Sequence, residues 1–445
     1  MSALARIALT AYRWAGIVAF PCAGLFLSIR AAKGKEDRTR RLERVGYAAA
    51  NRPRGPLVWV HAASVGEMMA VTALMRELRR CEINVLLTTG TTTSAQIASD
   101  RLQDGIIHQY VPIDALPAVR RFLDYWQPDM MIGVESEIWP TMLQDLHDRQ
   151  IPQILVNARI SDRSFARWQR HPNVASSLFS KLAMVVAQSD VDAERFRDLG
   201  AWPVSVSGNI KVDTDAPPCD SSLLASYERQ IGHRKTWAAI STAEGEEKIA
   251  AMVHRALKAH MGQLSIVVPR HPERADVIEA MMIEQGLTVA RRSRNDPITP
   301  QTDVFLGDTI GEMGLYLRLT DIAFVGRSMM KEGGGGNPME PAVLGCAVLS
   351  GPHVENFRES YQRLVRHGAA RVVRDAETLA KAVHFLMNNH LARHKMSDSG
   401  MEAVQDMRGA LTATIKAMEP YINPLTVKAR LEPKTAAGES QEAAL

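Results

Sequence analysis

The sequence predicts an α/β protein made of two similar domains, and three observations support this. From Pro56 onward, short apolar runs alternate with amphipathic helical patterns, as in repeated β–α–β units with a parallel sheet. A polar segment with two prolines, residues 213–222, interrupts the alternation, which then resumes. The length of 445 residues is too great for one small core and fits two domains of about 150 to 220 residues.

An apolar segment near the N-terminus predicts a membrane anchor over 1–30. Residues 14–29 carry no charge, yet at about 1.5 Å per helical residue they reach only part-way across a roughly 30 Å hydrocarbon core. The seven basic and three acidic residues of 30–44 give +4, the net charge of the whole chain. We expect a short signal-anchor or an interfacial helix, with the basic segment against anionic lipid headgroups. A cleaved signal peptide and a buried core helix are the alternatives.

The composition excludes several other functions. The 53 lysines and arginines nearly balance the 49 aspartates and glutamates, so no chain-wide basic field exists and nucleic acid is not an expected partner. The four cysteines are scattered without a CxxC pair, which argues against a disulfide framework or a thiolate metal site. We expect the soluble part to work in a reducing compartment.

The elements of the first domain follow one another in regular alternation. Strands are predicted at 56–62, 84–89, 108–113, 129–134, 152–158 and 182–188. Helical patterns separate them, and the one over 66–80 places Met68, Val71, Met75 and Leu78 on one face. An N-terminal Rossmann-like domain is therefore expected over 31–212.

A second run of the same kind is expected beyond the linker at 213–222. Strands are predicted at 236–241, 264–269, 287–291, 302–307, 321–326, 346–351 and 370–374, giving a second Rossmann-like domain over 223–424. Residues 425–445 are polar and are expected to be disordered. Two Rossmann-like domains facing a cleft suit a GT-B glycosyltransferase architecture. Ligands of such sheets bind beyond the carboxyl ends of the strands, so the loops there are the candidate sites.

The first candidate loop is HAASVGE, residues 61–67, between a strand and a helix. Glu67 would lie at the mouth of the cleft, where its carboxylate can serve as a general base. Gly66 would let a ligand approach closely. The alternative is purely structural, because Ser64 and Glu67 also fit a capping box that satisfies backbone amides at the start of the helix.

The second candidate loop is GGGGNPMEP, residues 333–341. Asn337 is a preferred N-cap, Pro338 suits the first helical position and Glu340 falls at the third. Glycines ahead of a helix N-terminus form a positively polarised hollow in which phosphate binds without a metal. The alternative is a flexible surface loop.

Other loops contribute single charged residues. PRHPER places Arg270 at the end of a strand, GNIKVD places Lys211 before the linker, and ESEIWP places two carboxylates after the strand at 129–134. Each also has an ordinary interpretation as a polar turn, a solvated lysine or a helix entry. The D-x-D triplets at 190–192 and 213–215 are interpreted as a helix start and as linker, so no metal and no cofactor is assigned.

Ten motifs in one order resemble a known family. They are WVHAASVGE, ESEIWP, NARISDRS, GNIKVD, STAEGEE, PRHPER, GDTIGEMGLY, DIAFVG, GGNPMEP and GPHVENF. From about Arg44 to Arg374 the chain resembles the 3-deoxy-D-manno-octulosonic acid (Kdo) transferases of Gram-negative lipopolysaccharide synthesis. The resemblance implies metal-independent, inverting transfer of Kdo from CMP-Kdo to the 6′-hydroxyl of a lipid A precursor (lipid IVA), at the cytoplasmic side of the cell inner membrane.

The resemblance also implies that the domain over 31–212 binds the acceptor and that the domain over 223–424 binds the CMP-sugar. It further implies roles for particular residues. Glu67 corresponds to the family's proposed base, and Glu135 and Lys211 correspond to positions that stabilise the transition state. The implied CMP-binding residues are Pro269, Arg270, Ile310, Gly311, Glu312, Met313, Asn337, Pro338, Met339 and Glu340.

Three positions in the expected donor-binding half depart from the family's pattern. Arg327 stands where the family usually has glycine, and Gly336 and Ala243 stand where it usually has histidine. Two further hypotheses therefore remain. One is a catalytically silent, membrane-attached nucleotide-sugar-binding protein, and the other is a GT-B enzyme that uses another nucleotide sugar.

Overall fold

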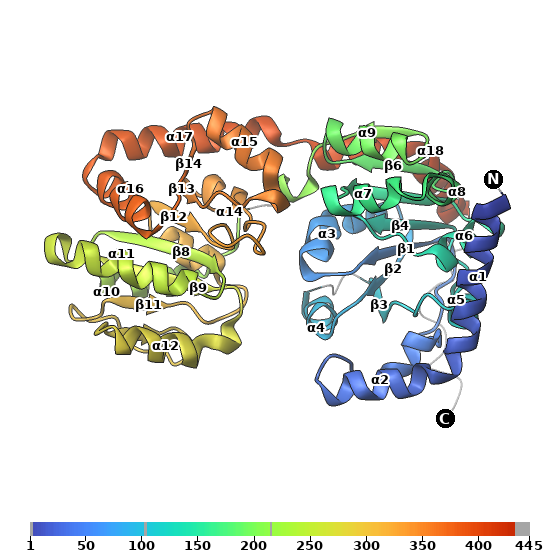
Figure 1. Cartoon of the computed structure of the whole chain (residues 1–445), viewed down its shortest axis with the longest axis horizontal. Coiled ribbons are helices and arrows are strands. Elements are labelled where there is room, and N and C mark those ends of the chain that lie inside the picture. Colours follow the sequence, from blue (N-terminus) through green and yellow to red (C-terminus); the bar gives the residue numbers. More distant parts are fainter. Residues whose placement is uncertain (1–2, 102–104, 214–215, 432–445) are drawn as a thin grey trace, which may run out of the picture. The chain divides into compact units, whose positions relative to one another are not determined.

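The computed structural model describes residues 3–101, 105–213 and 216–431, and the chain forms two compact units. The N-terminal unit comprises Met1–Thr214 and Gly409–Leu445, and the C-terminal unit comprises Asp215–Arg408. Each unit has one parallel seven-stranded sheet flanked by helices (Figure 1). The predicted α/β class with two Rossmann-like domains is confirmed.

The sheet of the N-terminal unit has the order β3-β2-β1-β4-β5-β6-β7 with all neighbours parallel. Its strands are β1 Leu57–Ala62, β2 Asn84–Thr89, β3 Ile107–Tyr110, β4 Met130–Val134, β5 Gln153–Ala158, β6 Met184–Ala187 and β7 Val204–Val206. The first six were predicted, and the edge strand β7 has only three residues. The order reverses between β1 and β4, and open α/β sheets bind ligands at such a switch point.

The sheet of the C-terminal unit repeats this plan in the order β10-β11-β9-β8-β12-β13-β14. Its strands are β8 Thr236–Thr242, β9 Leu264–Pro269, β10 Val289–Arg291, β11 Val304–Leu306, β12 Ile322–Val325, β13 Ala347–Ser350 and β14 Ala370–Val372. All seven coincide with predicted strands. Here the switch point lies between β8 and β12, which are parallel neighbours.

Helices cover both sheets, whose central strands are buried on both faces and therefore read as continuous apolar runs. The N-terminal unit has α3 Val65–Arg80, α4 Thr92–Arg101, α5 Leu116–Trp126, α6 Pro140–Asp148, α7 Asp162–Gln169, α8 Pro172–Phe179 and α9 Asp190–Asp198. The C-terminal unit has α10 Ser221–Ile231, α11 Glu246–Met261, α12 Ala275–Glu284, α13 Met313–Arg318, α14 Met339–Val343, α15 Arg358–Arg366, α16 Ala376–Asn388 and α17 His390–Met407. The predicted inner face of α3, Met68, Val71, Met75 and Leu78, is buried.

The structure differs from the expected boundaries at the C-terminal end. Helix α18, Ala410–Leu431, belongs to the N-terminal unit, where Met418 and Ile422 join the core that β1 and α3 form. The second domain therefore ends at Arg408 and not at 424. Residues 425–431, expected to be disordered, are helical, whereas 432–445 lie outside the described residues.

Two helices precede the first sheet, α1 Ala3–Ala19 and α2 Ala23–Ala32, joined by the 3-10 turn Phe20–Cys22. By length and composition Ala5–Ala32 is able to cross a membrane. Pro21 lies in the turn, and the two helices run in different directions (Figure 1). Helix α1 packs against α5, α6 and α8 of the N-terminal unit.

Candidate active site

The carboxylate of Glu67 is fixed at the carboxyl end of β1. Ser64 is the N-cap of α3, and its hydroxyl donates to Glu67 Oε1 at 2.8 Å while the Ala63 N–H donates to Oε2 at 2.8 Å. The Glu67 N–H in turn donates to Ser64 Oγ at 3.3 Å. Half of the capping box expected as an alternative to function is therefore present, because Ser64 caps the Glu67 N–H whereas the Glu67 carboxylate accepts from Ala63 and not from the Ser64 N–H. The bonds from Ala63 and Ser64 orient the carboxylate.

The surroundings of Glu67 favour its protonated form. The pKa of Glu67 is raised above its usual value, first because the side chain is largely buried and further because Glu135 and Glu137 bear negative charges nearby. Hydrogen bonds from Ser64 and Ala63 act in the opposite direction. A carboxylate with a raised pKa is a stronger base than an exposed glutamate, as general-base catalysis requires.

Glu135 and Lys211 form an ion pair beside this carboxylate. Glu135 follows β4 with a φ of +62°, a region that side chains other than glycine rarely adopt. Lys211 lies in the 3-10 turn Ile210–Val212, and its Nζ contacts Glu135 Oε1. Both side chains are about one-fifth exposed. The structure thus brings the three predicted residues Glu67, Glu135 and Lys211 together at the switch point of one sheet.

Two further residues belong to this cluster: His61, which the sequence did not single out, and Glu137, one of the two carboxylates expected after the strand at 129–134. His61 is fully buried on β1, with Nδ1 3.1 Å from the Thr88 carbonyl oxygen and Nε2 3.4 Å from Glu137 Oε2. The Trp139 indole donates to Glu137 Oε2 at 2.7 Å. Burial would raise the pKa of Glu137, but His61 and Trp139 outweigh it and the pKa is lowered. Both residues stand in motifs quoted above, His61 in HAASVGE and Glu137 in ESEIWP, so their positions could have been found from the sequence.

The predicted nucleotide-binding residues occupy three loops of the C-terminal unit. Pro269 ends β9, and the exposed Arg270 follows it, held by a bond from its N–H to the Thr242 carbonyl oxygen at 3.0 Å. Ile310 is 70% exposed in the loop between β11 and α13. In the same loop Gly311 has a φ of +88°, and Glu312, which precedes Met313, accepts from Arg292 at 2.7 Å.

The third loop, Asn337–Glu340, keeps the expected capping bond of Asn337, although α14 begins one residue later than expected. The N-cap of α14 is Pro338 without a side-chain cap, and the helix has only five residues, too few for a large dipole. The Asn337 side chain accepts from the Met339 N–H at 3.1 Å, as an N-cap does, and donates to Glu340 Oε1 at 3.3 Å. Burial raises the pKa of Glu340, against the effect of Asn337 and Arg270.

The glycines before this loop do not form an open flexible segment. The Gly335 N–H donates to the Arg327 carbonyl oxygen at 2.7 Å, and the Gly336 N–H donates to the Gly326 carbonyl oxygen at 2.9 Å. A Cβ added at Gly333 would lie 2.1 Å from the Arg327 carbonyl oxygen. Close backbone packing therefore requires glycine there.

The three departures from the family's pattern lie close to one another. Ala243 follows β8, and Arg327 follows β12, the neighbouring strand. The carboxylate of Glu246 accepts from the N–H groups of Ala243 and Arg327 at 2.8 and 2.6 Å. A Cβ added at Gly336 would lie 2.9 Å from Val325 Cγ1.

The acidic triplets have structural roles. Asp192 accepts from the Ser189 hydroxyl at 2.6 Å and from the Ile160 N–H at 3.0 Å, which ties α9 to the end of β5. Asp213 accepts from the N–H groups of Gly409 and Leu411 and so holds the start of α18. Within 3–101, 105–213 and 216–431, no three His, Cys, Asp or Glu side chains gather as a metal site would require.

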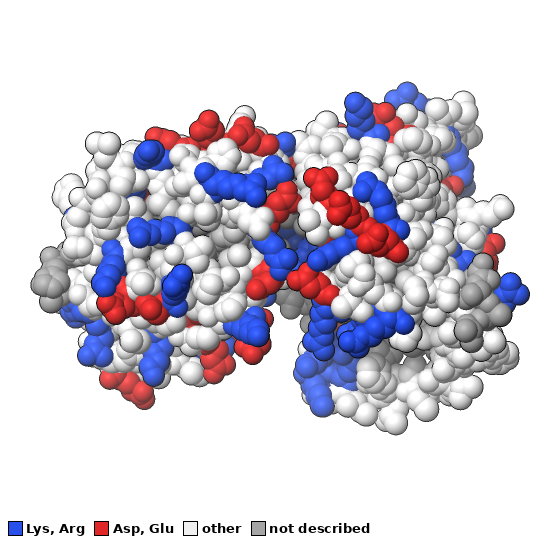
Figure 2. All heavy atoms as spheres, turned by 45° about the horizontal axis from the view of Figure 1, so that its top comes forward, with Lys and Arg blue, Asp and Glu red and all other residues white. Residues whose placement is uncertain are grey.

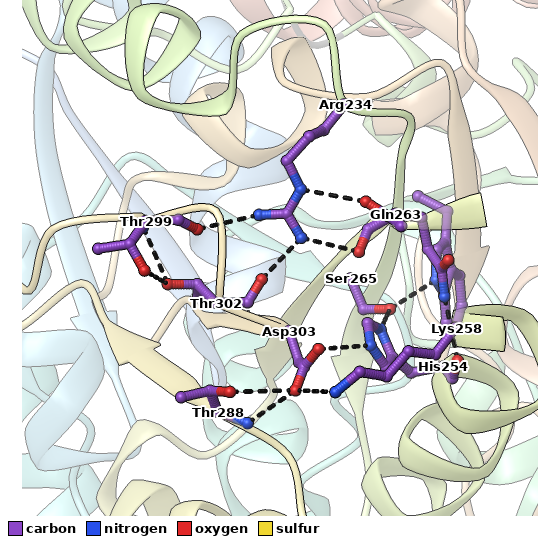
Figure 3. A network of polar contacts seen from close by, with 11 residues as sticks. Arg234, His254, Lys258, Gln263, Ser265, Thr288, Thr299, Thr302 and Asp303 are labelled. Atoms are coloured by element: carbon purple, nitrogen blue, oxygen red, sulfur yellow. Dashed lines mark hydrogen bonds and ion pairs between the residues drawn. The ribbon is translucent and has the colours of Figure 1, made fainter. Parts of the chain in front are cut away.

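A second polar network in the C-terminal unit has the residue types of a catalytic triad (Figure 3). Ser265 Oγ lies 2.8 Å from His254 Nδ1, and His254 Nε2 lies 3.2 Å from Asp303 Oδ1. In a hydrolytic triad Nε2 faces the serine, so the ring is reversed here. Ser265 is fully buried and accepts from the Trp237 indole at 2.7 Å. This network joins α11 to the sheet and offers no nucleophile to a substrate.

Two parallel Rossmann-like sheets with charged loops at their switch points define the GT-B class of glycosyltransferase folds. Solved structures agree in fold. A glycosyltransferase from Rickettsia africae superposes with a TM-score of 0.59 over 83% of this chain and 99% of its own, at 11% identity. The UDP-GlcNAc 2-epimerase of Neisseria meningitidis superposes with a TM-score of 0.55 over 82% of this chain and 100% of its own, at 14% identity.

Sequence relatives identify the family. Residues 39–214 match the profile of 3-deoxy-D-manno-octulosonic-acid transferase (kdotransferase). The Haemophilus influenzae enzyme of that name is 34% identical over 409 residues, which cover 89% of this chain and 95% of the relative. The Bordetella pertussis enzyme of the same name is 33% identical over 393 residues, which cover 85% of this chain and 91% of the relative. This chain belongs to the Kdo transferase family and is a glycosyltransferase.

Proposed function

We infer that the chain transfers Kdo from CMP-Kdo to the 6′-hydroxyl of a lipid A precursor, lipid IVA, with inversion and without a metal ion. The observation that carries this proposal is Glu67, an oriented carboxylate whose pKa is raised by burial and by neighbouring carboxylates. Such a group is suited to take a proton from an attacking hydroxyl, a contribution of typically about a hundred- to ten-thousand-fold in rate.

The proposed reaction is a single displacement at the anomeric carbon of Kdo. The acceptor oxygen forms the new bond, the bond from the anomeric carbon to the phosphate oxygen breaks, and CMP leaves with the bonding electrons. Glu67 receives the hydroxyl proton. Because attack occurs opposite the leaving group, one displacement inverts the anomeric configuration.

Glu135 and Lys211 are proposed to stabilise the transition state. Bond breaking gives the sugar oxocarbenium character and places negative charge on the departing phosphate. The ion pair supplies a fixed carboxylate and a fixed ammonium group, one of each sign. The strained φ of Glu135 is consistent with a position held for function.

The C-terminal unit is proposed to hold the CMP group. Arg270 would contact the phosphate, and the exposed side chain of Ile310 would offer apolar surface to the base. Asn337 and Glu340 would provide hydrogen bonds to the nucleoside. Positive side chains and backbone N–H groups would stabilise the leaving group in the role that a metal ion has in other transferases.

The N-terminal helices are proposed to lie in the cytoplasmic surface of the inner membrane. On one side of α1, Tyr12 donates to Asp114 at 3.1 Å, and Arg13 pairs with Asp145 at 3.4 Å. These contacts favour an interfacial helix over a spanning signal-anchor. The large apolar side chains that are half or more exposed on these helices are Ile7, Trp14, Val18, Leu25, Phe26 and Ile29.

Exposed basic residues adjoin this apolar surface. Lys33, Lys35, Arg38 and Arg41 are exposed, whereas Arg30 and Arg44 pair with Glu36. Figure 2 shows lysine and arginine side chains gathered beside a largely uncharged area on the lower part of the N-terminal unit. Such a combination favours anionic headgroups. If it docks the chain, Trp14→Glu should reduce sedimentation with anionic vesicles, and alkaline carbonate should extract the wild type.

The function is tested by incubating the full chain with CMP-Kdo and tetraacyl lipid A precursor and measuring the mass of the lipid product by mass spectrometry. We expect a mass gain of one or more Kdo units, lost in Glu67→Gln and retained in Glu77→Gln, a control on the same helix. A fully active Glu67→Gln would overturn the assignment of the base. No product from the folded wild type would indicate another nucleotide sugar or a silent binding protein, and protection against heat by UDP compounds instead of CMP would distinguish them.

A further inference from the structure

Arg327 has an unusual backbone conformation at the switch point of the second sheet. It follows β12 after Gly326 and has a φ of +58°. Glycine adopts this left-handed region freely, whereas a side chain with a Cβ does so at a cost in free energy. Among the described non-glycine residues with positive φ, Arg327 is the only basic one.

The surrounding hydrogen bonds hold Arg327 in that conformation. Its N–H donates to Glu246 Oε2 at 2.6 Å, and its carbonyl oxygen accepts from the Gly335 N–H at 2.7 Å. The next residue, Ser328, donates its N–H to Glu246 Oε1 at 2.9 Å. The direction in which the Arg327 side chain leaves the backbone is therefore fixed by bonds on both sides.

The side chain of Arg327 lies near enough to Arg270 for the two positive charges to repel each other. Neither Arg327 nor Arg270 takes part in an ion pair with any residue within 3–101, 105–213 and 216–431. Burial, and then the charge of Arg270, lower the pKa of Arg327, while Glu246 opposes them. The Glu246 carboxylate is already occupied by backbone N–H groups. An anion bound between the two arginines would relieve their repulsion.

The ligand that fits is a phosphate group. Arg270 follows β9 and Arg327 follows β12, on either side of β8, so both lie at the carboxyl end of the sheet. The guanidinium fork matches two phosphate oxygens at once. We propose that Arg327 is a second cationic contact, beside Arg270, for the phosphate of the nucleotide-sugar donor. This proposal rests on the proposed function, because it takes the CMP group as the nucleotide.

The experiment measures CMP and cytidine binding to the full chain by calorimetry in detergent. Arg327→Gln should weaken CMP binding by about ten- to a hundred-fold, as expected for loss of a hydrogen bond between charged groups, and should leave cytidine binding unchanged. Arg327→Lys should restore part of the loss. Arg255→Gln, an exposed arginine further along α11, should bind CMP as the wild type does.

A third variant separates binding from structure. Arg327→Gly should lose CMP affinity as Arg327→Gln does, yet its Tm should equal or exceed that of the wild type because the strained φ is relieved. A large fall in Tm would show instead that the side chain is needed for packing. Equal CMP affinity in Arg327→Gln and wild type would overturn the contact.

The outcomes also distinguish this proposal from the proposed function. If CMP binding depends on Arg327 but no Kdo is transferred, the contact stands and the proposed reaction fails. If Kdo is transferred and the CMP affinity of Arg327→Gln equals that of the wild type, the proposed reaction stands and the proposed contact fails. If the folded wild type binds no CMP, both fail.

Discussion

The buried carboxylate of Glu246 holds two loops of the C-terminal unit together, and its replacement should loosen the loop that carries Arg327. Glu246 is 1% exposed. It accepts from the backbone N–H groups of Ala243, Arg327, Ser328 and Met329 at 2.8, 2.6, 2.9 and 2.9 Å. The first belongs to the loop after β8, and the other three belong to the loop after β12.

Glu246→Gln keeps the shape of the side chain and removes half of its acceptors. One of the two terminal atoms becomes an NH2 group, so about two of the four hydrogen bonds are lost and two buried donors are left facing another donor. At about 1.5 to 3 kcal/mol for each bond to a charged group, the loss is about 3 to 6 kcal/mol. For a unit of this size that corresponds to a fall in Tm of roughly 6 to 24 °C.

Two measurements test this reasoning. Circular dichroism gives Tm, and hydrogen exchange with mass spectrometry gives the protection of the amides at 327–329. The control is Glu244→Gln, an exposed neighbour in the same loop, which should leave both unchanged. A Tm within about 2 °C of the wild type, together with unchanged exchange at 327–329, would refute the view that this carboxylate fixes the loop.

Three further predictions follow from the charges of the N-terminal unit. Because burial raises the pKa of Glu67, the rate constant kcat/KM should rise with pH through a value above the ordinary carboxyl pKa, as a pH–rate profile would show. Lys211→Met removes the partner of Glu135, so kcat should fall about a hundredfold and the acid limb should move to higher pH, because an unpaired Glu135 raises the pKa of Glu67 further. Burial and then the charge of Arg40 lower the pKa of His108 from 6.5 to about 4 in the folded chain. As the pH falls, His108 is therefore protonated in the unfolded chain before it is protonated in the folded chain. The free energy of unfolding should therefore fall by about 1.4 kcal/mol per pH unit between pH 6.5 and 4, a slope that urea unfolding should find reduced in His108→Gln.

The sheets could be predicted from the sequence because buried parallel strands leave a plain signal. Among the described residues, thirteen of the fourteen strands coincide with predicted apolar runs, whereas the edge strand β7 has no buried residue and so leaves a weaker signal. The path of α18 could not be predicted. Pro420 and Pro424 lie inside it, and proline is ordinarily a sign that a helix has ended. Its packing partners, α3 and the 3-10 turn Ile210–Val212, both lie far earlier in the chain, on the other side of the C-terminal unit in sequence.

The sequence indicated candidate residues for the site but not how they are arranged. The motifs pointed to Glu67, Glu135 and Lys211, but their meeting depends on β1 lying next to β4, which the alternation of strands and helices does not specify. Nothing in ESEIWP indicates which carboxylate will pair with lysine and which with histidine. The capping bond expected of Asn337 is present, since its side chain accepts from the Met339 N–H, but α14 begins one residue later than expected and has only five residues.

The position of α18 has a consequence for how the chain folds while the ribosome is still synthesising it. The C-terminal unit is an insertion, so residues 1–214 emerge without Met418 and Ile422, two side chains that complete their core. At about 5 to 20 residues per second, the missing helix follows roughly 10 to 40 s later. During that interval the apolar surface of α3 that α18 later covers stays exposed to water and to chaperones. A chain truncated after residue 214 should aggregate, whereas the inserted unit can close its own core before the helix arrives.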